Sequence, residues 1–211
     1  MKKTDDKTRK LTKAEQKRLE KFEITKAELE EQGYEMKEHT LGIVYANVMA
    51  FVIAVPLMLP VILAYAFLDR SYRIELYEVG IMLAVVYIFF IVLHEAVHGI
   101  TWACFAKKHF KSIEFGIMPE MLTPYCTCSE PLKRWQYILG SLMPLFVVGY
   151  IPSIIAVVFG KFWLLLAGLI MIIGAGGDII VTSRMLRYKP EKQDVVYYDH
   201  PTKCGFITFE K

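Results

Sequence analysis

Two histidines and a glutamate stand close together in the sequence at His94-Glu95-Ala-Val-His98. On an α-helix, residues i and i+4 lie about 40° from eclipsed, so both imidazoles project from one face at ligand spacing. Two histidines so placed can hold Zn²⁺, with the glutamate beside them as general base on the attacking water. The pattern therefore predicts His94 and His98 as zinc ligands and Glu95 as the catalytic residue. The alternative is a hydrogen-bonded pair of core histidines.

A catalytic zinc normally takes three protein ligands and a water, so a third ligand must come from elsewhere in the chain. Asp178 is the only other acidic residue in the long apolar stretches of the sequence. At the rise of an α-helix, Asp178 lies about 9 Å from the basic end of its stretch and His98 about 13 Å from the basic end of its own. The two residues are therefore expected at similar depths in the membrane. Without a metal contact, Asp178 would be a packing or proton-relay acid. Four other candidate ligands lie within residues 109–130 and would need a fold-back: His109, Glu114, Glu120 and Glu130.

The elements that must position these residues are indicated by the uneven distribution of charge. The 211 residues include 25 Lys and Arg and 22 Asp and Glu, yet four long stretches contain only Glu95 and Asp178 among them. Roughly 20 apolar residues span a bilayer. We therefore expect four transmembrane helices, at Leu41–Leu68, Val79–Ala106, Trp135–Gly160 and Phe162–Ser183. This composition excludes an ordinary soluble enzyme, and a net charge of +3 is too small to indicate a nucleic-acid partner.

Basic residues flank the apolar stretches unevenly, and Lys and Arg concentrate on the cytosolic side of membrane proteins. Eleven precede Leu41, the loop Asp69–Glu78 has two, and Lys161 stands alone in a tight connection between the last two stretches. The alternation predicts an integral membrane protein with both termini in the cytosol. It divides the chain into a charged cytosolic segment, 1–40, a four-span domain, 41–183, and a cytosolic tail, 184–211.

Proline and glycine modify the expected helices. Pro56 and Pro60 predict a kink or break in the first stretch, because proline is poorly tolerated inside a helix. Gly174, Gly176 and Gly177, beside Asp178, lack side chains and predict a close approach of the fourth helix to the second.

The remaining segments have weaker patterns. Thr12-Lys-Ala-Glu15 and Thr25-Lys-Ala-Glu28 both have capping-box spacing, which predicts two short helices ending near Gly33, in the cytosol or on the membrane. The alternative for this segment is a solvated tail. Apolar and polar residues alternate within Phe110–Glu130, which predicts a β-hairpin or re-entrant edge. The expected fold class is thus an all-α integral membrane protein with a short β-like insertion between spans two and three. The cysteines are expected to be reduced thiols, and the pair Cys126 and Cys128 lacks a second pair at zinc-finger spacing.

Several motifs together resemble known membrane peptidases. They are His94-Glu95-Ala-Val-His98-Gly99, Gly140-Ser-Leu-Met-Pro144, Gly177-Asp178-Ile179 and Asp199-His-Pro-Thr-Lys-Cys-Gly205. Over most of residues 41–209 the chain resembles the small bacterial family of putative zincin peptidases, and more distantly it is similar to the site-2 protease class. The resemblance implies zinc at His94, His98 and Asp178, with Glu95 catalytic. Unlike the usual site-2 pattern, Gly177 precedes Asp178 and no asparagine stands before Pro144.

These observations predict a zinc metalloendopeptidase of the HExxH type that works within or beside the membrane. Its partners would be the lipid bilayer and a membrane-embedded or membrane-proximal protein substrate, cleaved by a zinc-activated water with Glu95 as general base. Two alternatives stay open: a divalent-metal transporter, and a catalytically silent zinc-binding scaffold. A transporter needs polar sites across the bilayer, whereas the first and third stretches contain no charged residue.

Overall fold

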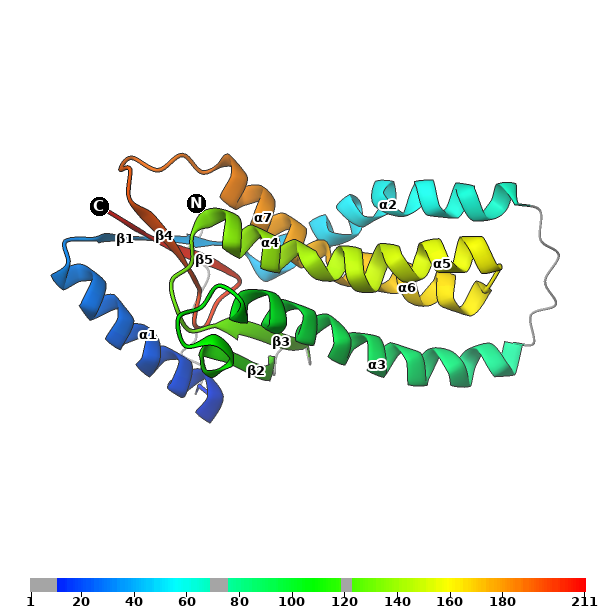
Figure 1. The fold of residues 1–211 in the computed structure, drawn as a ribbon, viewed down its shortest axis with the longest axis horizontal. Coiled ribbons are helices and arrows are strands. Elements are labelled where there is room, and N and C mark those ends of the chain that lie inside the picture. The colour runs from blue at the N-terminus through cyan, green and yellow to red at the C-terminus, as the bar shows by residue number, and fades with distance from the viewer. Residues whose placement is uncertain (1–10, 69–75, 119–122) are drawn as a thin grey trace.

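The computed structural model describes residues 11–68, 76–118 and 123–211. Long helices extend together toward one end of the molecule, while the strands and the first helix gather at the other (Figure 1). Three helical stretches are long and apolar enough to cross a membrane: Ile43–Phe67, Arg134–Phe159 and Phe162–Arg187. They indicate a membrane protein. The second expected span corresponds to α3 (Leu76–Ala103). Within the described residues, its segment Tyr87–Ala103 is apolar but shorter than the other three helical stretches.

Proline does not interrupt the first of these helices. Of the kink or break that the sequence predicts, the break is absent from α2 (Ile43–Phe67), which continues through Pro56 and Pro60. The axis of α2 bends along its length instead (Figure 1). The hydroxyl of Tyr150 donates to the Leu57 carbonyl at 3.1 Å between the two prolines.

The third and fourth expected spans are each composed of two helical pieces. α4 (Arg134–Pro144) passes through a π-helical turn, Leu145–Tyr150, into α5 (Ile151–Phe159). Gly160, at φ 65°, then turns the chain tightly into α6 (Phe162–Gly174). A break at Ala175 separates α6 from α7 (Gly176–Arg187), which places Asp178 in the first turn of α7.

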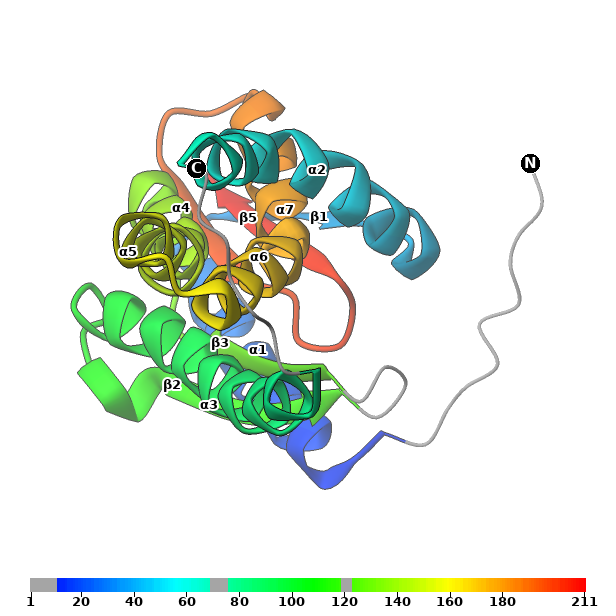
Figure 2. The same ribbon diagram turned by 90° about the vertical axis from the view of Figure 1, so that its right-hand side faces the viewer.

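The glycines beside Asp178 bring helices together, but not the expected pair. A Cβ on Gly176 would lie 2.6 Å from the Cβ of Ala50 on α2, so α7 approaches the first span closely. A Cβ added to Gly174 or to Gly177 would have no neighbouring atom within 4 Å. The predicted close contact of all three glycines with the second span is therefore wrong. The fourth expected span does approach the second, because α3 packs on α6 as well as on α4 and Asp178 meets His94, but the approach is not made through these glycines. Figure 2 shows α3 and α2 on opposite sides of the bundle.

The charged N-terminal region forms one helix and a strand. α1 (Lys13–Glu31) begins at the predicted Thr12 capping box and ends before Gly33, whose φ of 88° suits a residue without a side chain. The second predicted helix start, at Thr25, lies inside α1. The helix continues because Phe22 and Leu29 pack against a sheet, on Tyr198, Ile207 and Phe209.

That sheet corrects the all-α expectation. β1 (Glu35–Thr40), β5 (Gly205–Glu210) and β4 (Val195–Asp199) form an antiparallel sheet in the order β1-β5-β4, so the C-terminal tail is folded. The expected hairpin is confirmed: β2 (Ile113–Met118) pairs antiparallel with β3 (Thr123–Cys128) after a short 3₁₀ turn, His109–Ser112. The loop Asp69–Glu78 lies largely outside the described residues, and so does the candidate ligand Glu120.

Candidate metal centre

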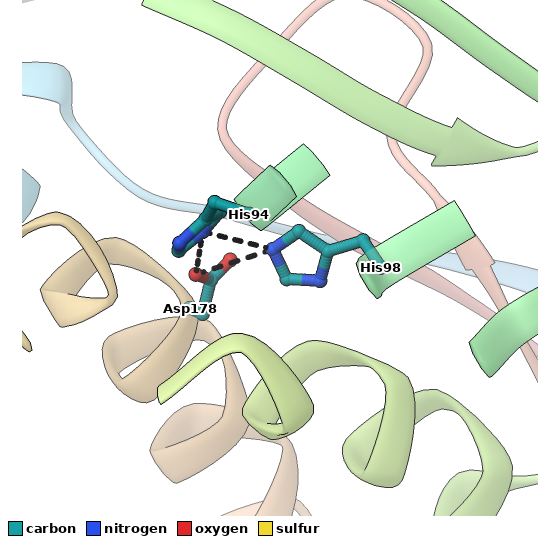
Figure 3. Close-up of side chains that lie close together, drawn as sticks. All are labelled: His94, His98 and Asp178. Carbon is teal, nitrogen blue, oxygen red and sulfur yellow. Dashed lines mark hydrogen bonds and ion pairs between the residues drawn. The ribbon is translucent and has the colours of Figure 1, made fainter. Parts of the chain in front are cut away.

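Two helices far apart in the sequence bring three donor atoms together. His94 and His98 project from one face of α3, and Asp178 meets them from the first turn of α7 (Figure 3). The Nε2 atoms of the two imidazoles are 3.2 Å apart, and Oδ2 of Asp178 lies 3.4 Å from each. The helix N-terminus also favours a negative charge at Asp178. His94 and His98 are both buried, so water is largely excluded from around the imidazoles.

The spacing of these donors fits a tetrahedral zinc ion. Zinc binds histidine nitrogen and carboxylate oxygen at about 2.0–2.2 Å, which places tetrahedral ligands roughly 3.3–3.5 Å apart. The two separations of 3.4 Å from the carboxylate lie within this range, and the 3.2 Å between the imidazole nitrogens is 0.1 Å below it. Nδ1 of His98 lies 2.8 Å from the Gly140 carbonyl oxygen. A carbonyl only accepts hydrogen bonds, so Nδ1 carries a proton and Nε2 is the ring nitrogen that faces the centre and can bind a metal there.

α4 supports the histidines from behind through main-chain carbonyls. The indole of Trp102 stacks on the His98 ring, with centroids 5.0 Å apart and planes inclined by 14°. Its Nε1 donates to the carbonyl of Tyr137 at 3.2 Å, one turn before Gly140. A Cβ on Gly140 would lie 2.1 Å from Nε1 of Trp102, so this approach requires glycine. Two carbonyls of α4 thus fix the imidazole and the indole packed on it.

A partly buried carboxylate anchors the same part of α4 to the sheet. The hydroxyl of Tyr137 donates to Oδ1 of Asp199, at the end of β4, at 2.8 Å. Burial raises the pKa of Asp199 to about 6, although the Tyr137 hydrogen bond and the Arg18 charge oppose the shift. From α4, Ser141 also reaches the main-chain carbonyl of Asp178 at 3.5 Å. Sequence reasoning assigned no role to Tyr137 or Asp199; the only signal was the Asp199-His-Pro motif.

Glu95 lies beside the donors. Its carboxylate is partly buried and interacts electrostatically with His94, His98 and Asp178. It also accepts a hydrogen bond from the main-chain N–H of Cys126 on β3. A carboxylate held next to a metal centre by one main-chain donor keeps lone pairs free to take up a proton.

A comparison with protein families connects this centre with a known group. A family model described as "Putative zincin peptidase" matches residues 87–192, which is about half of the chain and contains all three donors and Glu95. The chain belongs to this zincin peptidase family. Membership indicates, at a coarse level, a zinc metallopeptidase. Comparisons with curated proteins and with solved structures gave no match.

In this member of the zincin peptidase family, the other candidate ligands have different partners. Glu114 forms an ion pair with Lys21, and Glu130 accepts hydrogen bonds from Ser112 and from the main chain of Lys107 and Lys108. Nδ1 of His109 bonds the Ala103 carbonyl at 3.0 Å. The cysteines are free thiols. Within the described ranges, only His94, His98 and Asp178 form a group of three metal-ligating side chains.

Proposed function

We propose that this protein hydrolyses a peptide bond in a membrane-embedded or membrane-proximal protein, as a metalloendopeptidase of the HExxH type. The observation that carries the proposal is the triangle of donors from α3 and α7, with sides of 3.2, 3.4 and 3.4 Å. Three protein ligands leave a fourth tetrahedral position for water or substrate, as catalytic zinc sites require. A silent structural site would be closed by four protein ligands.

The chain's residues have separable roles in this reaction. A zinc ion held by His94, His98 and Asp178 would supply a Lewis acid and a water of lowered pKa. Glu95 accepts the proton of the attacking water and delivers it to the amine nitrogen as the peptide bond breaks. The Gly140 carbonyl holds His98 in the tautomer that directs Nε2 at the centre. Trp102 packs on the same ring and limits its rotation.

The depth of the centre indicates where cleavage takes place. His98 lies five residues before the end of α3 at Ala103, about 7–8 Å at the helical rise. The basic residues that follow α3 and end α7 favour a cytosolic position for this end by the positive-inside rule. The scissile bond therefore lies near the cytosolic face. With α3 counted as a fourth span, the arrangement is similar to the site-2 protease class.

The substrate must be extended where it is cut, because a helix keeps its carbonyls in internal hydrogen bonds. β3 lies against α3 and directs the N–H of Cys126 toward Glu95. An unwound substrate segment that pairs with the hairpin beside this position would present its carbonyl to the centre. Strand addition of this kind supplies affinity through main-chain hydrogen bonds.

The decisive experiment compares the wild-type protein with Glu95→Gln and His94→Ala in lipid nanodiscs. Elemental analysis should find about one zinc per chain in the wild type and in Glu95→Gln, and much less in His94→Ala. Turnover is followed by mass spectrometry of new N-termini in co-reconstituted single-span membrane proteins. Glu95→Gln should lower it by roughly 10²–10⁴-fold, the usual contribution of a general base. Undiminished proteolysis by Glu95→Gln would exclude Glu95 as the base, and wild-type zinc in His94→Ala would exclude the centre.

A further inference from the structure

A second concave site lies away from the metal centre, between α1 and the β2–β3 hairpin. It has a volume of about 280 Å³. Three lysines line it, Lys17 and Lys21 from α1 and Lys111 from the 3₁₀ turn, together with Phe115 and Tyr125 of the hairpin. The peptidase chemistry proposed above uses none of these side chains, so the site calls for a separate explanation.

Positive charge predominates in this cleft. Among the described residues that line it, Glu114 is the only acid, against three lysines. Lys21 forms a short ion pair with Glu114, while Nζ of Lys17 is 3.9 Å from the same carboxylate oxygen. The Lys17 side chain is 68% exposed. One carboxylate cannot neutralise three lysines, so the cleft suits an anion, and Lys is a common ligand of phosphate as a point charge.

The surroundings of the cleft are apolar and exposed. Phe110, Phe115 and Ile117 expose 64%, 58% and 63% of their surfaces. They follow directly after the apolar helix α3, at the level where the chain becomes rich in lysine. Large apolar side chains next to lysines are typical of segments that lie at the boundary between lipid headgroups and acyl chains. A free soluble anion would gain nothing from these side chains, whereas a lipid would use both.

We propose that the cleft between α1 and the β2–β3 hairpin binds the headgroup of an anionic phospholipid. Lys17, Lys21 and Lys111 contact the phosphate, and the acyl chains lie against Phe115 and Ile117. The lipid then connects α1 to the hairpin, in addition to the Lys21–Glu114 ion pair. The inference rests on this cleft alone and does not require the peptidase reaction.

Native mass spectrometry of the detergent-purified full chain tests the proposal, with phosphatidylglycerol and phosphatidylcholine of matched acyl chains as probes. The wild type should retain phosphatidylglycerol in preference. Lys17→Gln/Lys111→Gln should lower this preference roughly ten- to thirtyfold, since each lysine near an anionic surface contributes about fivefold. It leaves the Lys21–Glu114 pair intact. Lys17→Arg/Lys111→Arg should restore binding, and the control Lys189→Gln/Lys203→Gln, with the same charge change elsewhere, should bind as the wild type.

Zinc content is measured in every variant as a control for folding, because this measurement does not depend on lipid binding. Unchanged preference in Lys17→Gln/Lys111→Gln, or an equal loss in the control, would overturn the assignment. If millimolar inorganic phosphate displaces phosphatidylglycerol, the cleft binds a soluble anion and the assignment of a lipid is wrong. Failure of phosphate to compete supports the lipid, because the apolar contacts are then required.

Discussion

Gly140→Ala is the substitution most directly predicted to disturb the metal centre without touching a ligand. The added methyl group would stand 2.1 Å from Nε1 and 2.2 Å from Cδ1 of Trp102, where ordinary contacts begin at 3.4 Å. The indole must therefore move by more than 1 Å, or α4 must withdraw. Trp102 is 4% exposed and packed against His98, so it has little room to move. Either response displaces the Gly140 carbonyl or the indole from His98.

The expected magnitude has two parts. Overpacking of a buried site costs about 1–3 kcal/mol, and loss of the hydrogen bond from Trp102 to the Tyr137 carbonyl costs about 1 kcal/mol more. Disturbing the partner that orients a metal-bound histidine typically lowers metal affinity by about 10–100-fold. Gly140→Ala should therefore weaken zinc binding by this factor and lower the free energy of unfolding by roughly 2–4 kcal/mol.

Zinc competition against a chelator and thermal unfolding, with and without zinc, measure the two parts separately. Gly174→Ala is the matched control, because no atom lies within 4 Å of its added methyl group. It should bind zinc as the wild type and be neutral or more stable by up to about 1 kcal/mol, the helix preference of alanine over glycine. If Gly140→Ala binds zinc as tightly as Gly174→Ala, the Gly140 carbonyl does not orient His98.

Four further outcomes are expected. Asp178→Ala should lose most of its bound zinc in elemental analysis; full occupancy would remove Asp178 from the centre. Zinc at about 100 times its dissociation constant should raise the unfolding free energy by about 2.7 kcal/mol in thermal unfolding, and His94→Ala should lack this response. Tyr137→Phe should cost roughly 1–3 kcal/mol in the same measurement, because it leaves the buried Asp199 without this hydrogen bond. Burial raises the pKa of folded Asp199 from 3.8 to about 6, so the folded state binds more protons in this window and stability falls as pH rises through it. Asp199→Asn should remove that part of the pH dependence, and an unchanged profile would contradict the shift.

Local periodicity explains which features could be predicted from the sequence. The face shared by His94 and His98 depends only on helix geometry, and the alternation in the β2–β3 hairpin only on strand geometry. The meeting of Asp178 with these histidines was inferred from comparable depth in two apolar helices, a constraint that the membrane imposes on both.

Features that depend on distant contacts were missed or misassigned. β1, Glu-Met-Lys-Glu-His-Thr, has no apolar alternation, and its strand conformation depends on pairing with β5 at the far end of the chain. Gly176 was assigned to the wrong neighbour because small residues indicate a close approach without identifying the partner helix. The hydrogen bond from Tyr137 to Asp199 joins residues 62 positions apart, which no local pattern shows.

The order of strands in the β1-β5-β4 sheet determines when the protein can finish folding. β5 is the central strand, and ribosomes make it after every helix among the described residues. β1 therefore emerges, and the apolar helices are inserted, while the strand that must pair with both neighbours does not yet exist. Asp199, which anchors α4 behind the histidines, belongs to the same late-forming unit. Full support of the metal ligands therefore waits for the synthesis of β5, which follows the described apolar helices.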